Sequence, residues 1–171
     1  MKSKIMIAAM ALLVGVLSAC EKRDYLLGLP EYDHHYYIAY VPYTNAQVTV
    51  NKNQAALLKF PVSFNSSFTR SYDAVAQYVL TPATIAGTGA AVLGADFNVV
   101  DKNGAVINPV NGKYSIVFPK AEKARDTIYI KLLNNQVPGA RSVNIDLIEN
   151  VTSEYRVDTM SVAFRRPLRI N

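Results

Sequence analysis

The chain offers few residues of the types that carry catalytic chemistry. It has two histidines, His34 and His35, among 171 residues. A hydrolase of the Ser-His-Asp kind needs a histidine held within hydrogen-bond reach of both partners. The two histidines are neighbours in a polar segment, residues 21–35, and neighbours on a strand would point to opposite faces. We therefore expect a solvated linker, since a zinc site of Asp33, His34 and His35 would lack the four spaced ligands of closed sites.

Carboxylates are the other candidates for catalysis. Glycoside hydrolysis needs two acids on either side of a cleft, and almost any two of the 13 acidic residues could be proposed. The glycines of Gly87-Thr88-Gly89 precede two alanines and no helical pattern, so they do not form a phosphate-binding loop. We expect a protein that is not an enzyme and has no cofactor, with a small hydrolase as the less favoured alternative.

The single cysteine, Cys20, has the setting of an attachment point. Lys2 and Lys4 precede an apolar run, residues 5–17. As a helix this run would be about 20 Å long, which is short of the roughly 30 Å hydrocarbon core of a bilayer. A positive start, a short apolar stretch and small residues after it are typical of a secretory signal peptide.

The four residues Leu17-Ser18-Ala19-Cys20 resemble the lipobox of bacterial lipoproteins. The resemblance implies cleavage before Cys20, a lipid on its sulfur and acylation of the new amine. Two or three acyl chains would anchor the protein stably, whereas one binds a membrane only marginally. It predicts a signal peptide over residues 1–19, a lipidated cysteine with a tether over residues 20–35, and a membrane as partner. A buried thiol in a retained helix is the alternative.

Charge gives no reason to expect a nucleic-acid partner. The chain carries 18 basic and 13 acidic residues, and two of the basic ones lie in the signal segment. The basic cluster at residues 165–169 is interpreted as a solvated chain end. Residues 21–24, after the cysteine, mix both signs, without an acidic cluster and without an Asp directly after Cys20. The lipoprotein resemblance therefore favours the outer membrane of the cell envelope, with its periplasmic or surface face left open.

Two kinds of residue are candidates for binding or modification. Six of the 11 tyrosines lie in residues 25–43, and stacked tyrosines can bind sugar rings or anchor a protein partner. The candidates for ligand stacking are Tyr36, Tyr37 and Tyr40. The alternative is a first strand with both faces covered, since Tyr favours strands.

Asp126-Thr127-Ile128 and Asp158-Thr159-Met160 resemble the O-glycosylation acceptor motif of Bacteroidota. Thr127 and Thr159 are therefore candidate glycosylation sites. Both threonines fall at the start of expected strands. Unmodified β-branched residues on an exposed strand face are the alternative.

The elements that must position these residues are strands. Apolar residues alternate with polar ones in several stretches after the tether, which is the strand period. The clearest are residues 58–64, 113–118, 126–133, 142–149 and 160–164. Turn signals such as Asn111-Gly112 separate them. The sequence predicts an all-β fold, a single immunoglobulin-like sandwich of about seven to nine strands over residues 36–171.

Two details of this pattern are specific enough to check. Pro61 removes a backbone donor, so its strand is expected at a sheet edge or with a bulge. In the stretch 142–149, Asn144 and Asp146 are expected on the outward face of the strand.

From Gly94 onward the sequence resembles a Calx-beta-like module and the immunoglobulin-like domains of Bacteroidota lipoproteins. The pattern is Gly94-Ala95-Asp96-Phe97, then YSIVFPKAEKARDTIYIKLLNN and SVNIDLIEN. The resemblance implies a sandwich whose acidic loops can bind calcium. In this chain Asn134-Asn135 replaces the acidic turn and Arg141 stands where a glutamate would fall. The remaining calcium candidates, Asp96, Asp101 and Asp126, are too scattered to supply six to eight oxygens, so no metal site is expected.

These observations predict a non-catalytic lipoprotein of the cell envelope that acts as a binding or assembly module. The Bacteroidota resemblance implies a place near glycan-uptake machinery, and hence an accessory role in glycan capture. The alternative is a structural or adhesion module that contacts only other proteins. Its partner would then be another envelope or outer-membrane protein.

Overall fold

The computed structural model describes residues 33–171. The predicted signal peptide, Cys20 and most of the predicted tether lie outside the described residues. Over residues 33–171 we find no helix with the length and apolar character needed to cross a bilayer.

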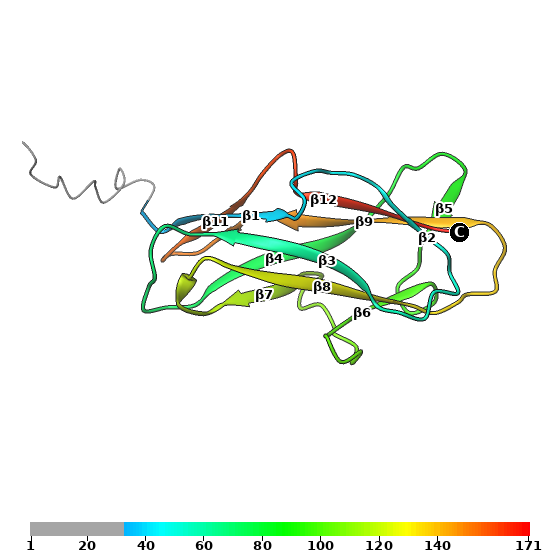
Figure 1. Cartoon of the computed structure of the whole chain (residues 1–171), viewed down its shortest axis with the longest axis horizontal. Helices are drawn as coiled ribbons and strands as arrows, with labels where there is room; N and C mark the ends of the chain where they lie inside the picture. Colours follow the sequence, from blue (N-terminus) through cyan, green and yellow to red (C-terminus); the bar gives the residue numbers. More distant parts are fainter. Residues whose placement is uncertain (1–32) are drawn as a thin grey trace, which may run out of the picture. The chain divides into compact units, whose positions relative to one another are not determined.

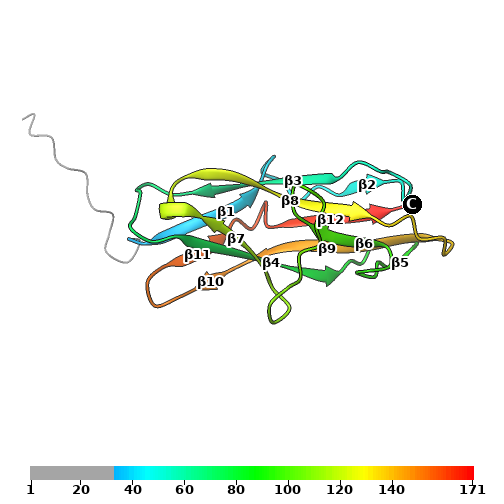
Figure 2. The same cartoon turned by 90° about the horizontal axis from the view of Figure 1, so that it is seen from below.

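From His34 onward the chain forms two β-sheets that pack face to face (Figures 1 and 2). Sheet A has the order β10-β11-β1-β3-β8-β6. Its strands are β1 (His35–Tyr40), β3 (Leu58–Asn65), β6 (Phe97–Val100), β8 (Ala124–Leu132), β10 (Asn150–Val151) and β11 (Arg156–Thr159). Sheet B has the order β2-β12-β9-β4-β7, with β5 beside β9. Its strands are β2 (Val48–Val50), β4 (Ala74–Pro82), β5 (Thr88–Ala90), β7 (Tyr114–Phe118), β9 (Ala140–Ile148) and β12 (Arg165–Ile170).

The predicted all-β sandwich is confirmed, although residues 33–171 form twelve strands and not the predicted seven to nine. Its core follows from the alternation in the sequence. The inward residues of β7 and β8 are buried, namely Tyr114, Ile116, Phe118, Ile128, Ile130 and Leu132. The rings of Phe64 on β3 and Phe118 on β7 stack with their centroids 4.4 Å apart and so join the two sheets. Burial of such aromatic side chains supplies much of the apolar area that stabilises a domain of this size.

The expectation that Pro61 marks an edge strand is wrong, because β3 lies between β1 and β8. Pairing with β1 covers Val62–Asn65 and stops before the proline. The Pro61 carbonyl accepts a hydrogen bond from the Val41 N–H at 2.9 Å. Pro61 therefore keeps one bond to the residue that follows β1, and the reciprocal N–H bond that proline cannot donate is missing only at the end of this pairing.

The C-terminal residues differ most from the prediction. Residues 160–164, expected as a strand, form a turn in which the Ala163 N–H donates to the Met160 carbonyl. The last strand is β12, which pairs with β9 and β2. The interpretation of residues 165–169 as a solvated chain end is therefore wrong. Alternation places Arg166, Leu168 and Ile170 on the buried face of β12.

The outward residues of β9 are on the predicted face, but they are buried. Arg165 donates two hydrogen bonds to Asp146, at 2.7 and 2.8 Å, and Thr81 donates a third at 2.7 Å. Asn144 donates to the Pro82 carbonyl. These contacts cover the middle of sheet B from outside and satisfy the polar groups of the strand that carries them.

Candidate functional site

The three tyrosines proposed for ligand stacking lie in β1, and only one of them reaches the surface. Tyr36 and Tyr40 are buried, and the Tyr40 hydroxyl donates to the Ile145 carbonyl at 3.0 Å. Tyr37 is 38% exposed and its ring stacks on that of His35. Tyr36 and Tyr40 therefore present no ring face to a ligand, which leaves Tyr37 as the one candidate of the three.

The two histidines begin the folded domain, so the expectation of a solvated linker is wrong for them. The His35 Nε2 atom lies 2.5 Å from the Asp158 carboxylate, and the His34 Nδ1 atom lies 2.6 Å from the Tyr72 hydroxyl. Burial raises the pKa of Asp158, but hydrogen bonds from Arg156 and His35 outweigh burial and hold this pKa below its ordinary value. These contacts attach the start of β1 to the sandwich.

The three calcium candidates do not form one cluster, and each accepts hydrogen bonds from the protein. Asp96 is buried and accepts one hydrogen bond from a backbone N–H and one from Asn135. Asp101 accepts backbone N–H groups of its own turn, and above all that of Ala105 holds its pKa below the ordinary value. Asp126 accepts the N–H of the next residue at 2.6 Å. Over residues 33–171, no three His, Cys, Asp or Glu side chains are grouped to hold a metal ion.

The predicted glycosylation sites lie in strands of sheet A. Thr127 lies within β8 and Thr159 at the end of β11, and both are half-buried. Glycosylation of these residues stays a prediction. Cys20, the predicted lipid site, lies outside the described residues.

The sequence did not predict a groove that lies on one side of the sandwich, between the edge of sheet A and the edge of sheet B. In sheet B, β7 is an edge strand that pairs only with β4. In sheet A, β8 pairs with β6 only from Tyr129 to Leu132. Residues 124–128 of β8 therefore have no strand beside them on that side. The two free stretches are joined by the short 3-10 helix η2 (Pro119–Ala121), seen in Figure 1 where β7 passes to β8.

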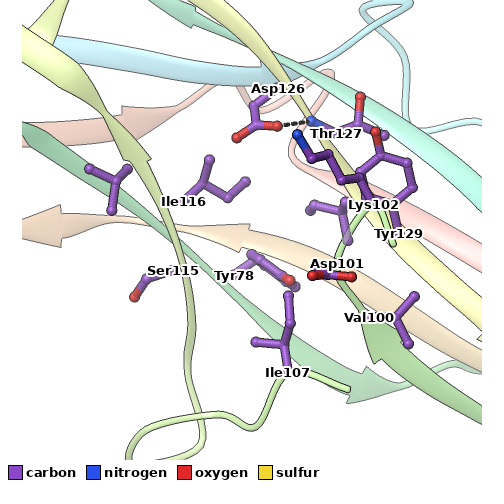
Figure 3. A pocket seen from close by; sticks show the side chains of 12 residues that line it. Tyr78, Val100, Asp101, Lys102, Ile107, Ser115, Ile116, Asp126, Thr127 and Tyr129 are labelled. Atoms are coloured by element: carbon purple, nitrogen blue, oxygen red, sulfur yellow. Dashed lines mark hydrogen bonds between the residues drawn. The ribbon is translucent and has the colours of Figure 1, made fainter. Parts of the chain in front are cut away.

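A cavity of about 430 Å³ lies between these two free edges. This volume is within the usual range of ligand sites. Figure 3 shows side chains of β4, β7 and β8 around the cavity, with those of the loop after β6 beside them. The residues that line it include Tyr78, Asp101, Lys102, Ile116, Asp126 and Ile128.

The inner surface of the groove combines an apolar floor with a carboxylate and a phenol. Ile116 and Ile128 are buried on the facing sheets. Asp126 has the same strand parity as Ile128, so its side chain is on the face of β8 that is turned to sheet B. Burial raises the pKa of Tyr78 well above its ordinary range, and the charges of Tyr114 and Asp126 add to this. The Tyr78 hydroxyl therefore stays protonated and can donate a hydrogen bond.

The rim of the groove carries exposed apolar side chains beside the polar Lys102 and Ser115. Val117 of β7 is 52% exposed, and the loop before β7 adds three further exposed side chains, Val106, Ile107 and Val110. Of these side chains, Val117 and Ile107 line the cavity, and exposed apolar side chains beside a cavity are typical of an interaction site.

β7 is also the least protected of the sheet edges. Natural proteins protect edge strands by keeping them short, by covering them, or with charges and prolines. β2 has three residues and β10 has two, and bridges to Leu93 and Val106 flank β6. β7 has five residues, YSIVF, with neither charge nor proline. Its free backbone groups are therefore a template for another strand.

The arrangement suits binding better than catalysis. Two carboxylates, Asp101 and Asp126, line the cavity, but a glycosidase needs one acid whose pKa is raised so that it can donate a proton. The pKa of Asp101 is instead lowered by the N–H groups of its turn. No lining residue is a histidine or a cysteine.

Comparisons with known proteins give structural neighbours alone. No protein-family model matches the chain. No curated protein matches it either. It is similar to the crystal structure of the apo form of the Calx CBD1 domain, with 16% identity and a TM-score of 0.49 over 80% of this chain and 97% of that one. It is also similar to calcium binding domain CBD12 of CALX1.1 (18% identity, TM-score 0.47) and to CBD12 from CALX1.2 (17%, TM-score 0.42). Each of these two matches covers 78% of this chain and 44% of the other. The assignment of a sandwich rests on the strand pairing of this chain itself.

Proposed function

We propose that this protein is a lipid-anchored, non-catalytic binding or assembly module of the cell envelope, and that the groove beside β7 is its binding site. The observation that carries the proposal is the unprotected edge of β7. Its exposed Val117 adjoins a cavity of about 430 Å³ with an apolar floor.

Contact with another protein fits this groove better than direct capture of a glycan. A free strand edge offers alternating N–H and C=O groups, which pair most fully with another peptide backbone. The groove floor is formed by aliphatic side chains and the buried Tyr78. An accessory role in glycan capture would then work by docking this domain onto a component of the uptake machinery.

The predicted lipid on Cys20 complements this site. Anchoring a module in the same membrane as its partner raises the effective concentration of each for the other, so that a modest groove suffices. The lipobox-like residues Leu17-Ser18-Ala19-Cys20 support the anchor, and the outer membrane is its proposed location.

The native size of the chain after extraction from membranes with mild detergent tests the proposal. We expect an assembly larger than the free chain, which has a mass of 18.8 kDa before removal of the predicted signal peptide, and we expect Val117→Lys to release the free chain. Val162→Lys is the matched control, because Val162 is 64% exposed in the turn before β12. A Cys20→Ala chain should leave the membrane fraction. An assembly unchanged by Val117→Lys, or a free chain throughout, would contradict the proposed site.

A further inference from the structure

We propose that the groove takes an extended peptide segment of a partner protein, which adds as a strand to β7 and carries a basic and an apolar residue two positions apart. This inference rests on the proposed function and specifies the partner that the same site fits. It follows from the charges of the two free edges and from the spacing of residues across them.

Of the two free edges, β7 is the better template. The free stretch of β8 carries Arg125 and Asp126, and Asp126 is on the face turned to sheet B. An inward-pointing charge on an edge strand opposes the addition of another strand. β7 carries no charged residue. An added strand therefore extends sheet B beside β7 and leaves the edge of β8 open.

The added strand would face the free stretch of β8 across the groove. Alternate side chains of a strand point to the same face, so two inward residues of the added strand are two positions apart. On β8, Asp126 and Ile128 have this same spacing and face. One inward residue therefore meets Ile128 and the floor at Ile116 and Tyr78, and the other meets Asp126.

The residue opposite Asp126 should be basic. One Asp126 oxygen accepts the Thr127 N–H at 2.6 Å. Among residues 33–171, neither Lys102 of the cavity wall nor Arg125 forms an ion pair with this carboxylate. A lysine or arginine of the partner can therefore make a charge-assisted hydrogen bond there.

A second copy of this chain matches the groove less well. Self-pairing of β7 about Ile116 would place Ser115 opposite Val117 of the other copy. The strand sequence YSIVF holds no basic residue, so the Asp126 of each copy would remain unmatched. Charge complementarity thus favours a different protein as the source of the strand.

Selection of peptides on the full chain tests this inference. The probe is a phage-displayed library of random nine-residue segments, selected in parallel on the wild type, Asp126→Lys and Glu154→Lys. Glu154 is an exposed acid in the turn between β10 and β11, at the other edge of sheet A, so its reversal is a matched control. The wild type and the control should enrich segments with Lys or Arg two positions from an aliphatic residue.

A synthesised copy of the most enriched segment then gives the affinity. We expect Asp126→Lys to weaken binding by about tenfold or more, because attraction becomes repulsion, and Glu154→Lys to change it less than about twofold. Bound peptide should also slow hydrogen exchange in residues 114–118. Val117→Pro should abolish binding, and if that variant fails to fold, Asp126→Lys alone decides the matter.

Three results would overturn the inference. The first is enrichment of peptides that lack the predicted spacing, and the second is an equal loss of peptide affinity in Asp126→Lys and Glu154→Lys. The third is a dimer in analytical sedimentation that Val117→Lys dissociates, because a second copy of the chain would then occupy the groove. If the membrane assembly responds to Val117→Lys while no peptide pattern emerges, the proposed function stands and the peptide assignment fails. If that assembly does not respond either, both fail.

Discussion

Replacement of the buried Arg166 by methionine should destabilise the domain strongly, although this residue lies in a cluster that first suggested a solvated chain end. Its side chain is 4% exposed. The guanidinium donates to the Thr44 carbonyl at 2.7 Å and to the Pro42 carbonyl at 3.0 Å. It also lies 4.7 Å from the centre of the Tyr40 ring. It therefore attaches the loop between β1 and β2 to the last strand.

The size of the effect follows from these contacts. A hydrogen bond from a charged group contributes about 1.5 to 3 kcal/mol, and the cation–π contact about 1 kcal/mol. Methionine keeps much of the length of the side chain and removes a charge whose burial is costly, as the lowered pKa of Arg166 shows. The carbonyls belong to exposed residues, so water can replace the donor in part. We expect Arg166→Met to lower the free energy of unfolding by about 2 to 3 kcal/mol.

Urea unfolding of the full chain, followed by far-ultraviolet circular dichroism, measures this loss. Arg169→Met is the control, because Arg169 lies on the same strand, is half-buried and donates to the side chain of Asn171 alone. The control should change the free energy of unfolding by less than about 0.5 kcal/mol. Equal effects of the two substitutions would refute the structural role given to Arg166.

Three further predictions concern acidic residues. The pKa of Asp158 is lower in the folded chain than the unfolded value of about 4. Asp158 therefore stabilises the fold above that value, and this contribution is lost as pH falls through the folded pKa. Asp158→Asn should cost about 1 kcal/mol in urea unfolding at pH 7 and progressively less toward pH 2; a difference that persists at pH 2 would contradict this. Asp96→Ala should cost about 2 kcal/mol, because it leaves a backbone N–H and Asn135 without their acceptor, and an unchanged unfolding midpoint would contradict the described loop. Millimolar calcium should shift the thermal midpoint by less than about 1 °C, since over residues 33–171 no three His, Cys, Asp or Glu side chains are grouped to bind it; a rise of several degrees would show a site that the structure does not.

Strands with clean alternation could be predicted from the sequence. β7 and β8 lie where period-two patterning placed them, with the predicted residues inward. β12 was missed because its first inward residue is Arg166, and hydropathy alone cannot show that four loop oxygens and a tyrosine ring will surround a guanidinium. The segment 160–164 was predicted as a strand because its apolar and polar residues alternate, but its backbone forms a turn.

The tyrosines illustrate a second limit. The sequence shows a cluster of tyrosines in and around β1. The burial of each tyrosine ring depends on which face of the strand is turned to the other sheet. Side chains alternate along β1, so Tyr36 and Tyr40 lie on the face turned to the core and Tyr37 lies on the other face, where it is partly exposed.

The groove could not have been found from the sequence. It exists because β6 pairs with only part of β8 and because nothing pairs with the outer side of β7. Such gaps are properties of the topology. The sequence YSIVF has no charge or proline that would mark an edge strand. Its position at the edge is therefore known only from the strand pairing.

Site-specific photo-crosslinking in intact cells tests the proposed site most directly. A photoreactive amino acid would replace Val117 in one strain and the exposed Val162 in another, with the chain otherwise unchanged. The proposal predicts a discrete product heavier than the uncrosslinked chain from position 117, none from position 162, and loss of the product in an Asp126→Lys background. Discrete products of equal yield from both positions, or none from position 117, would contradict the assignment of the β7 groove as the binding site.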